Sequence, residues 1–144
     1  MSAENQYDGP GRVTAALHVG ISVRDMEEAL AWYGEHLGFT LVKDDGYVPP
    51  LDARVCFVER DGFQLELFEY SHPQPIPPER LEPNTDLRTL GTKHVAFRVD
   101  DMDAILARLR RGGVAIALET QMNGEQVAFI RDPSGVLLEL IQDR

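Results

Sequence analysis

The chain has 144 residues, a formal net charge of −10 at pH 7 and a single cysteine, Cys56. This length predicts one soluble domain that buries a core without disulfide bonds, and the acidity argues against binding nucleic acid through its phosphates. The sequence shows neither a secretory signal nor an apolar run long enough for a bilayer, so we expect a cytoplasmic protein without a membrane partner.

The first half of the chain predicts the element order β-α-β-β-β. Residues 1–11 are polar and indicate a flexible lead-in, and apolar residues at alternating or clustered positions then predict strands at 13–23, 39–48, 54–59 and 63–70. Asp25 is a good N-cap, Glu28 completes a capping box, and Gly38 ends the helix between the first two strands. Asp61-Gly62 predicts a hairpin turn. We assign residues 12–70 to this first module.

Residues 71–90 form a proline-rich stretch that separates the two halves. Five prolines exclude a central strand and disfavour a long helix. We expect a linker, or a loop that covers another part of the molecule.

The second half repeats the order of the first. Strands are predicted at 94–99, 114–118, 126–131 and 136–142, with a helix from Asp101 to about Arg111 that ends at Gly112-Gly113. Residues 91–144 therefore form a second module, and the chain as a whole is of the α+β class, with two βαβββ modules in a single domain.

Histidine and glutamate stand at matching places in the two halves. His18-Val-Gly-Ile-Ser-Val returns as His94-Val-Ala-Phe-Arg-Val, and Gln64-Leu-Glu66-Leu-Phe68 returns as Leu137-Leu-Glu139-Leu-Ile141. Side chains alternate between the faces of a strand, so the flanking leucines place both glutamates on the face away from the helices. All four candidates can share that face.

These motifs, together with Trp32-Tyr33, Leu37-Gly38-Phe39 and Asp132-Pro-Ser-Gly-Val-Leu-Leu-Glu139, resemble the vicinal oxygen chelate superfamily. That superfamily includes glyoxalase I, methylmalonyl-CoA epimerase, extradiol dioxygenases, and the fosfomycin and bleomycin resistance proteins. The resemblance runs from about residue 13 to residue 142. It implies a curved mixed sheet around a cup that binds a divalent metal ion through His18, Glu66, His94 and Glu139. It also implies a homodimer, and it leaves open whether one chain or two supply the four ligands.

Two imidazoles and two carboxylates suit Zn, Ni, Co, Mn or Fe(II). Such an ion acts as a Lewis acid on a carbonyl oxygen and stabilises an enolate, with Glu66 or Glu139 as the base. This favours an isomerase, epimerase or lyase that transfers a proton next to a carbonyl group. The alternatives are an extradiol-type Fe(II) dioxygenase, which typically uses two histidines and one carboxylate, and a binding or resistance protein without catalysis.

The face that carries the four candidates also predicts a binding site for a small-molecule substrate. Gln64, Phe68 and Tyr70 share this face with Glu66, whereas Gly20 and Ala96 leave space. Arg98 follows His94 on the same face, where it either holds a substrate carboxylate or phosphate or pairs with Asp100 or Asp101.

Other positions limit the resemblance or carry no expected role. Ser22 and Tyr70 stand where glutathione-dependent glyoxalase I usually has arginine and asparagine, so both glutathione contacts are missing. We expect His36 and His72 to be solvated.

Overall fold

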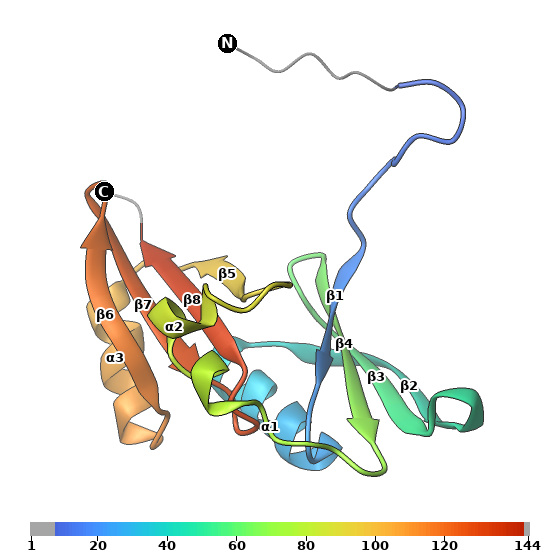
Figure 1. The fold of residues 1–144 in the computed structure, drawn as a ribbon. Helices are drawn as coiled ribbons and strands as arrows, with labels where there is room; N and C mark the ends of the chain where they lie inside the picture. Colours follow the sequence, from blue (N-terminus) through green and yellow to red (C-terminus); the bar gives the residue numbers. More distant parts are fainter. Residues whose placement is uncertain (1–7, 143–144) are drawn as a thin grey trace.

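The computed structural model describes residues 8–142 and contains two four-stranded sheets that follow one another along the chain (Figure 1). The first sheet consists of β1 (His18–Ser22), β2 (Thr40–Val48), β3 (Ala53–Arg60) and β4 (Phe63–Tyr70) in the order β1-β4-β3-β2. Strand β1 is parallel to β4, and the other neighbours are antiparallel. Helix α1 (Met26–Leu37) joins β1 to β2, and the short 3₁₀ helix η1 (Pro49–Leu51) joins β2 to β3.

The second sheet repeats this arrangement. It consists of β5 (Val95–Arg98), β6 (Ile116–Met122), β7 (Glu125–Arg131) and β8 (Leu137–Gln142) in the order β5-β8-β7-β6, with α3 (Met102–Arg111) between β5 and β6. Strand β5 is again parallel to β8. The predicted α+β fold with βαβββ twice is therefore confirmed. Strands β1 and β5 both lie at an edge of their sheets.

The predicted helix caps and hairpin turn are present. Asp25 and Asp101 each accept a hydrogen bond at 2.9 Å from the backbone N–H three residues on. Gly38 ends α1 with a φ of 75°, in the left-handed region that glycine adopts without strain. Asp61 and Gly62 both have positive φ, as a two-residue hairpin between β3 and β4 requires.

The last strand of each module holds the first turn of its own helix. The backbone N–H of Met26 donates to the Glu69 carboxylate, and that of Met102 donates to the Gln142 side-chain oxygen at 2.6 Å. These N–H groups have no partner within a helix, so a side chain from a neighbouring strand satisfies them. The acceptor is a charged carboxylate in the first module and a neutral amide oxygen in the second.

Residues of both modules form one buried cluster, and α1 lies between the two sheets (Figure 1). The Tyr33 hydroxyl on α1 donates to Asp132 Oδ2 at 2.8 Å, and both side chains are buried. Burial of the hydroxyl and the nearby Asp132 charge raise the pKa of Tyr33 well above its usual value. Phe39 and Phe97 meet edge to face with ring centroids 5.6 Å apart. The modules are thus packed together through α1.

Strand β1 begins later than predicted. The pattern predicted a strand from residue 13, but it begins at His18, and Val13 and Leu17 are 91% and 75% exposed. Strand β4, the only neighbour of β1, pairs with residues 18–22. Residues 13–17 have no partner strand within residues 8–142, and a strand needs one.

The prediction of a solvated His36 was wrong. His36 is only 8% exposed, and its ring packs against Trp32. Gly112, at the end of α3, lies so close that a Cβ there would be 2.7 Å from the His36 ring. Arg108 on α3 donates to the His36 carbonyl oxygen at 3.0 Å. The second module buries this side of α1, which the charged local sequence does not indicate.

The proline-rich stretch contains only the 3₁₀ helix η2 (Pro78–Arg80) and the one-turn helix α2 (Pro83–Asp86), so the prediction of no strand and no long helix is confirmed. It runs in front of β7 and β8, on the side opposite α3 (Figure 1). Arg131 on β7 donates to the Leu81 carbonyl oxygen at 2.8 Å and to Glu82 at 2.6 Å. The loop therefore lies against β7 of the second sheet. None of the helices within residues 8–142 is long and apolar enough to cross a membrane.

Candidate metal centre

The first module brings His18 and Glu66 into direct contact. His18 Nε2 lies 2.9 Å from Glu66 Oε2, and both side chains are partly exposed. In the parallel pairing of β1 with β4, Glu66 stands beside Gly20, two residues after His18 on the same face. The absence of a side chain at Gly20 leaves the histidine and the glutamate free to meet.

The second module contains the same contact. His94 Nε2 lies 2.7 Å from Glu139 Oε2. Glu139 stands beside Ala96 in the pairing of β5 with β8, so the small residue takes the place of Gly20. The His94 and Glu139 side chains are 28% and 14% exposed, which leaves them open to a ligand. Each module thus contains one contact between a histidine and a glutamate.

A phenylalanine packs against each histidine. The ring of His18 meets Phe57 edge to face at 5.4 Å between centroids, and the ring of His94 meets Phe129 at 5.0 Å. Each phenylalanine is the antiparallel partner of the glutamate in its own module. Sequence analysis missed these residues. The signal for Phe57 was available, because Phe57 and Glu66 are equally far from the Asp61-Gly62 turn, and a two-residue hairpin pairs such positions.

The expected substrate residues of the first module lie on the face of Glu66 but have different neighbours. Gln64 donates to Glu59 at 3.1 Å. The Phe68 ring fills the space beside Gly20, where an added Cβ would lie 3.2 Å from it. The space expected at Gly20 is thus taken up by an aromatic ring.

Tyr70 and Arg98 lie in the walls of two different cavities. One cavity of about 760 Å³ lies between β1, the linker and the start of β5, and its walls include Tyr70, Ser22 and His94. A second, more open hollow of about 1410 Å³ lies between the ends of α1 and α3 and strand β5, and its walls include Arg98 and Ala96. Within one chain, His94 and Arg98 therefore face different spaces.

The two His–Glu pairs also lie apart, because each belongs to its own sheet. Among residues 8–142, no three histidine, cysteine, aspartate or glutamate side chains come close enough to hold a metal ion together. Each pair offers one imidazole nitrogen and one carboxylate oxygen, and two such pairs provide the mixed set that suits a divalent ion. The donor chemistry fits a metal ion, whereas a single pair provides only half of a complete set.

A sequence model of the Glyoxalase/Bleomycin resistance protein/Dioxygenase superfamily matches residues 15–140, which is nearly the whole chain. The chain belongs to this superfamily. The resemblance recognised from the repeated motifs is thus confirmed, together with its fold.

Relatives and solved structures agree with this membership. The chain is 33% identical over 129 residues to the uncharacterised protein YaeR of Escherichia coli, with 87% of this chain and 93% of YaeR covered. It is 30% identical over 135 residues to a probable lactoylglutathione lyase of Synechocystis, with 88% and 93% covered. The crystal structure of a glyoxalase family protein from Enterococcus faecalis matches with a TM-score of 0.74 at 23% identity, with 88% and 96% covered. This last likeness shows the fold alone.

Proposed function

We propose that this protein is a divalent-metal-dependent isomerase, epimerase or lyase that transfers a proton on the carbon next to a carbonyl group. The repeated His–Glu contact carries the proposal. His18 meets Glu66 at 2.9 Å and His94 meets Glu139 at 2.7 Å, at equivalent sequence positions of the two modules. The 30% identity to a probable lactoylglutathione lyase supports chemistry of this class.

The two histidines and two glutamates would hold the ion. When bound, a divalent ion such as Zn, Ni, Co, Mn or Fe acts as a Lewis acid on the carbonyl oxygen and makes the neighbouring proton more acidic. Glu66 or Glu139 would take that proton and return it, because each carboxylate has a second oxygen that need not bind the ion. Phe57 and Phe129 would keep water from one side of each imidazole and fix its orientation.

A homodimer would complete the ligand set. Each chain presents two separate pairs, and the edge strands β1 and β5 each leave one side without a neighbouring strand. Such edges readily pair with another chain. In a dimer with two-fold symmetry, the first module of one chain would face the second module of its partner, which gives two identical four-ligand sites.

The substrate would be a small carbonyl compound. Arg98 is our candidate for binding a carboxylate or phosphate group on it, because guanidinium groups bind such anions through two hydrogen bonds. Gln64, Phe68 and Tyr70 would line the same cup once two modules face each other. With Ser22 and Tyr70 in place of the usual arginine and asparagine, we expect a substrate other than a glutathione adduct.

Metal analysis of the purified protein tests the proposal, with His94→Ala as the variant and His72→Ala as the matched control. His72 is exposed in the linker, and its ring meets the Tyr70 ring edge to face. We expect about one divalent ion per chain in the wild type and in His72→Ala, and loss of the ion in His94→Ala. Thioesters and α-hydroxycarbonyl compounds would then exchange protons with heavy water only when the metal is bound.

Two results would favour the alternatives. Iron as the bound metal, together with oxygen consumption, would favour the extradiol-type dioxygenase. Failure to bind any metal after reconstitution would favour a small-molecule-binding or resistance protein, which agrees with the observation that one chain assembles pairs of ligands only.

A further inference from the structure

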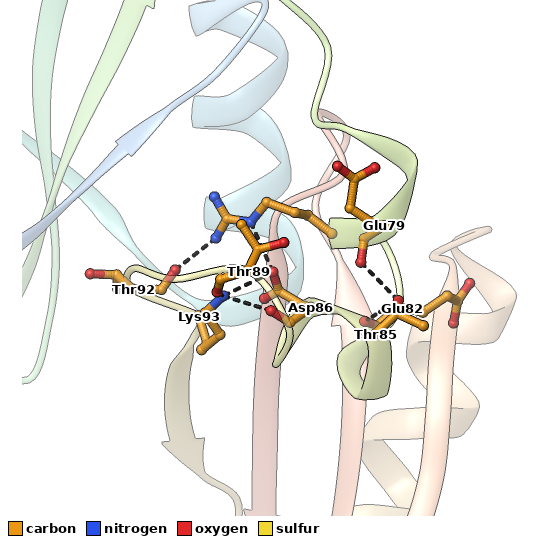
Figure 2. A network of polar contacts seen from close by, with 8 residues as sticks. Glu79, Glu82, Thr85, Asp86, Thr89, Thr92 and Lys93 are labelled. Atoms are coloured by element: carbon orange, nitrogen blue, oxygen red, sulfur yellow. Dashed lines mark hydrogen bonds and ion pairs between the residues drawn. The ribbon is translucent and has the colours of Figure 1, made fainter.

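An ion-pair network around the buried Asp86 side chain includes Lys93, the residue before His94 (Figure 2). The Lys93 ammonium group donates to the Asp86 carbonyl oxygen at 2.7 Å, to Asp86 Oδ1 at 3.3 Å and to the Thr89 carbonyl oxygen. An ammonium group has three donor hydrogens, so these contacts use all of them. Lys93 is therefore bound to the linker and has no donor left for a substrate.

Asp86 is the centre of this network. It is only 2% exposed, and it also accepts from Arg80 Nε at 2.8 Å. Arg80 in turn donates to the Thr92 carbonyl oxygen at 2.7 Å. Burial alone would raise the pKa of Asp86, but the hydrogen bonds from Arg80 and Lys93 outweigh it and hold the pKa below its usual value. At neutral pH the carboxylate is ionised and connects α2 to both residues that precede His94.

Within residues 8–142, no equivalent of this network is found before His18 in the first module. The residue before His18 is Leu17, which is 75% exposed and lies in a segment without secondary structure. The cavity wall, by contrast, contains Arg80, Asp86, Lys93 and His94 together. The two histidines are therefore held differently, because His18 lies in the pairing of β1 with β4, whereas His94 precedes β5 and follows residues that the linker binds.

We propose that Asp86 is a positioning residue that, through Lys93 and Arg80, holds His94 in place beside Glu139. The inference rests on the proposed function, in which His94 binds the metal ion. Consecutive Cα atoms are about 3.8 Å apart, so fixing the Lys93 side chain and the Thr92 carbonyl restricts the backbone of His94. A histidine side chain that is already held in its metal-binding position loses less conformational entropy when the ion binds, which increases the affinity for the ion. The linker thus contributes to the metal centre without touching the ion.

The test compares Asp86→Asn with Glu82→Gln in the full chain. Glu82 lies in the same linker and contacts Arg131 on β7, so its substitution weakens the linker without changing the Asp86 network. The first readout is the NMR signal of the histidine ring N–H groups in metal-free protein, with His18 as an internal reference. We expect Asp86→Asn to shift and broaden the His94 signal and leave that of His18 unchanged. Glu82→Gln should change neither.

The second readout is the affinity for Zn²⁺, measured by competition with a chromogenic chelator. Loss of a group that orients a metal ligand typically weakens metal binding about 10-fold to 100-fold. We expect a loss of this size in Asp86→Asn and less than about 2-fold in Glu82→Gln. If Asp86→Asn does not fold, Lys93→Met replaces it, because that variant keeps the Asp86–Arg80 pair.

The two readouts separate failure of this inference from failure of the proposed function. Wild-type protein that binds no Zn²⁺ would contradict the metal-dependent function, and the His94 signal would still decide the positioning role. An unchanged His94 signal in Asp86→Asn would overturn the inference. A shifted signal with unchanged Zn²⁺ affinity would overturn it as well, because the network would then not prepare His94 for the metal.

Discussion

The two modules place a histidine, a glutamate and a phenylalanine in the same relative positions, but they differ in what surrounds this frame. The linker lies over the second sheet and binds the chain just before His94, whereas an exposed segment precedes His18. The turn before the last strand also differs between the modules. Asp132, before β8, is buried, whereas Asp61, before β4, is exposed. Each module brings its own candidate ligand pair together, and in the second module the linker also binds the two residues before His94.

The largest expected difference between the modules is at these turns. Asp132, before β8, is buried and accepts from the Tyr33 hydroxyl and from the N–H groups of Ser134 and Val136 at 2.8 to 2.9 Å. Asp132→Ala leaves these donors without a partner, and we expect it to lower the free energy of unfolding by about 3 kcal/mol or more. Asp61→Asn, in the exposed turn of the first module, keeps a residue that tolerates the positive φ there and should cost less than about 1 kcal/mol. Urea unfolding measures both, and equal losses would contradict the comparison.

Removal of the hydrogen bond between Tyr33 and Asp132, which joins the two modules, should cause the next largest loss of stability. Tyr33→Phe keeps the packing of α1 but removes its buried hydrogen bond to Asp132. We expect a loss of about 2 kcal/mol, the usual range for a hydrogen bond to a charged group. A double-mutant cycle with Asp132→Ala should show that the two losses are not additive. Full additivity would mean that the hydroxyl and the carboxylate do not stabilise each other.

The side chains that accept hydrogen bonds from the first turns of α1 and α3 occupy corresponding places in the two modules. Their removal should cause smaller losses of stability. Glu69→Ala and Gln142→Ala each remove the side chain that accepts from the first turn of α1 or α3. We expect about 1 kcal/mol for each, with the larger loss at Glu69, because a carboxylate at a helix N-terminus also interacts with the helix dipole. Thermal unfolding in low salt would test the order, and a larger loss at Gln142 would contradict it.

The smallest expected effect appears at alkaline pH. Because the pKa of Tyr33 is raised in the folded state, the unfolded chain releases the Tyr33 proton first as the pH rises. The stability that this group contributes is present below about pH 10 and declines above it. The difference in unfolding free energy between wild type and Tyr33→Phe should therefore shrink between about pH 10 and pH 11. A difference that grows over this range would mean that the pKa of Tyr33 is not raised in the folded state.

Much of the fold was predictable because the signals are local. Alternating apolar residues indicate strands through burial of one face, and Asp25, Gly38 and Asp61-Gly62 satisfy the local backbone requirements of a cap or turn. The prediction that the histidines and glutamates share one face follows from strand parity and the repeat. These inferences depend on neighbours along the chain or on one pairing register.

The remaining features depend on packing between segments that are distant in sequence. The late start of β1 reflects the lack of a partner strand before His18, and burial of His36 depends on the end of α3. The placement of the two ligand pairs on separate sheets depends on α1 packing between the modules. The Asp86 network requires the linker to fold back before β5, and no local pattern marks a buried aspartate in a proline-rich stretch.

Mixing two defective variants tests most directly the proposal that both modules contribute to one metal centre across a dimer. His18→Ala and His94→Ala should each fail to bind the metal alone. After joint unfolding and refolding, a mixed dimer would contain one site with both substitutions and one site with neither. We expect about a quarter of all sites to regain metal when the chains pair at random. If both variants fold and form dimers but the mixture regains no metal, the four residues do not form a centre shared between two chains.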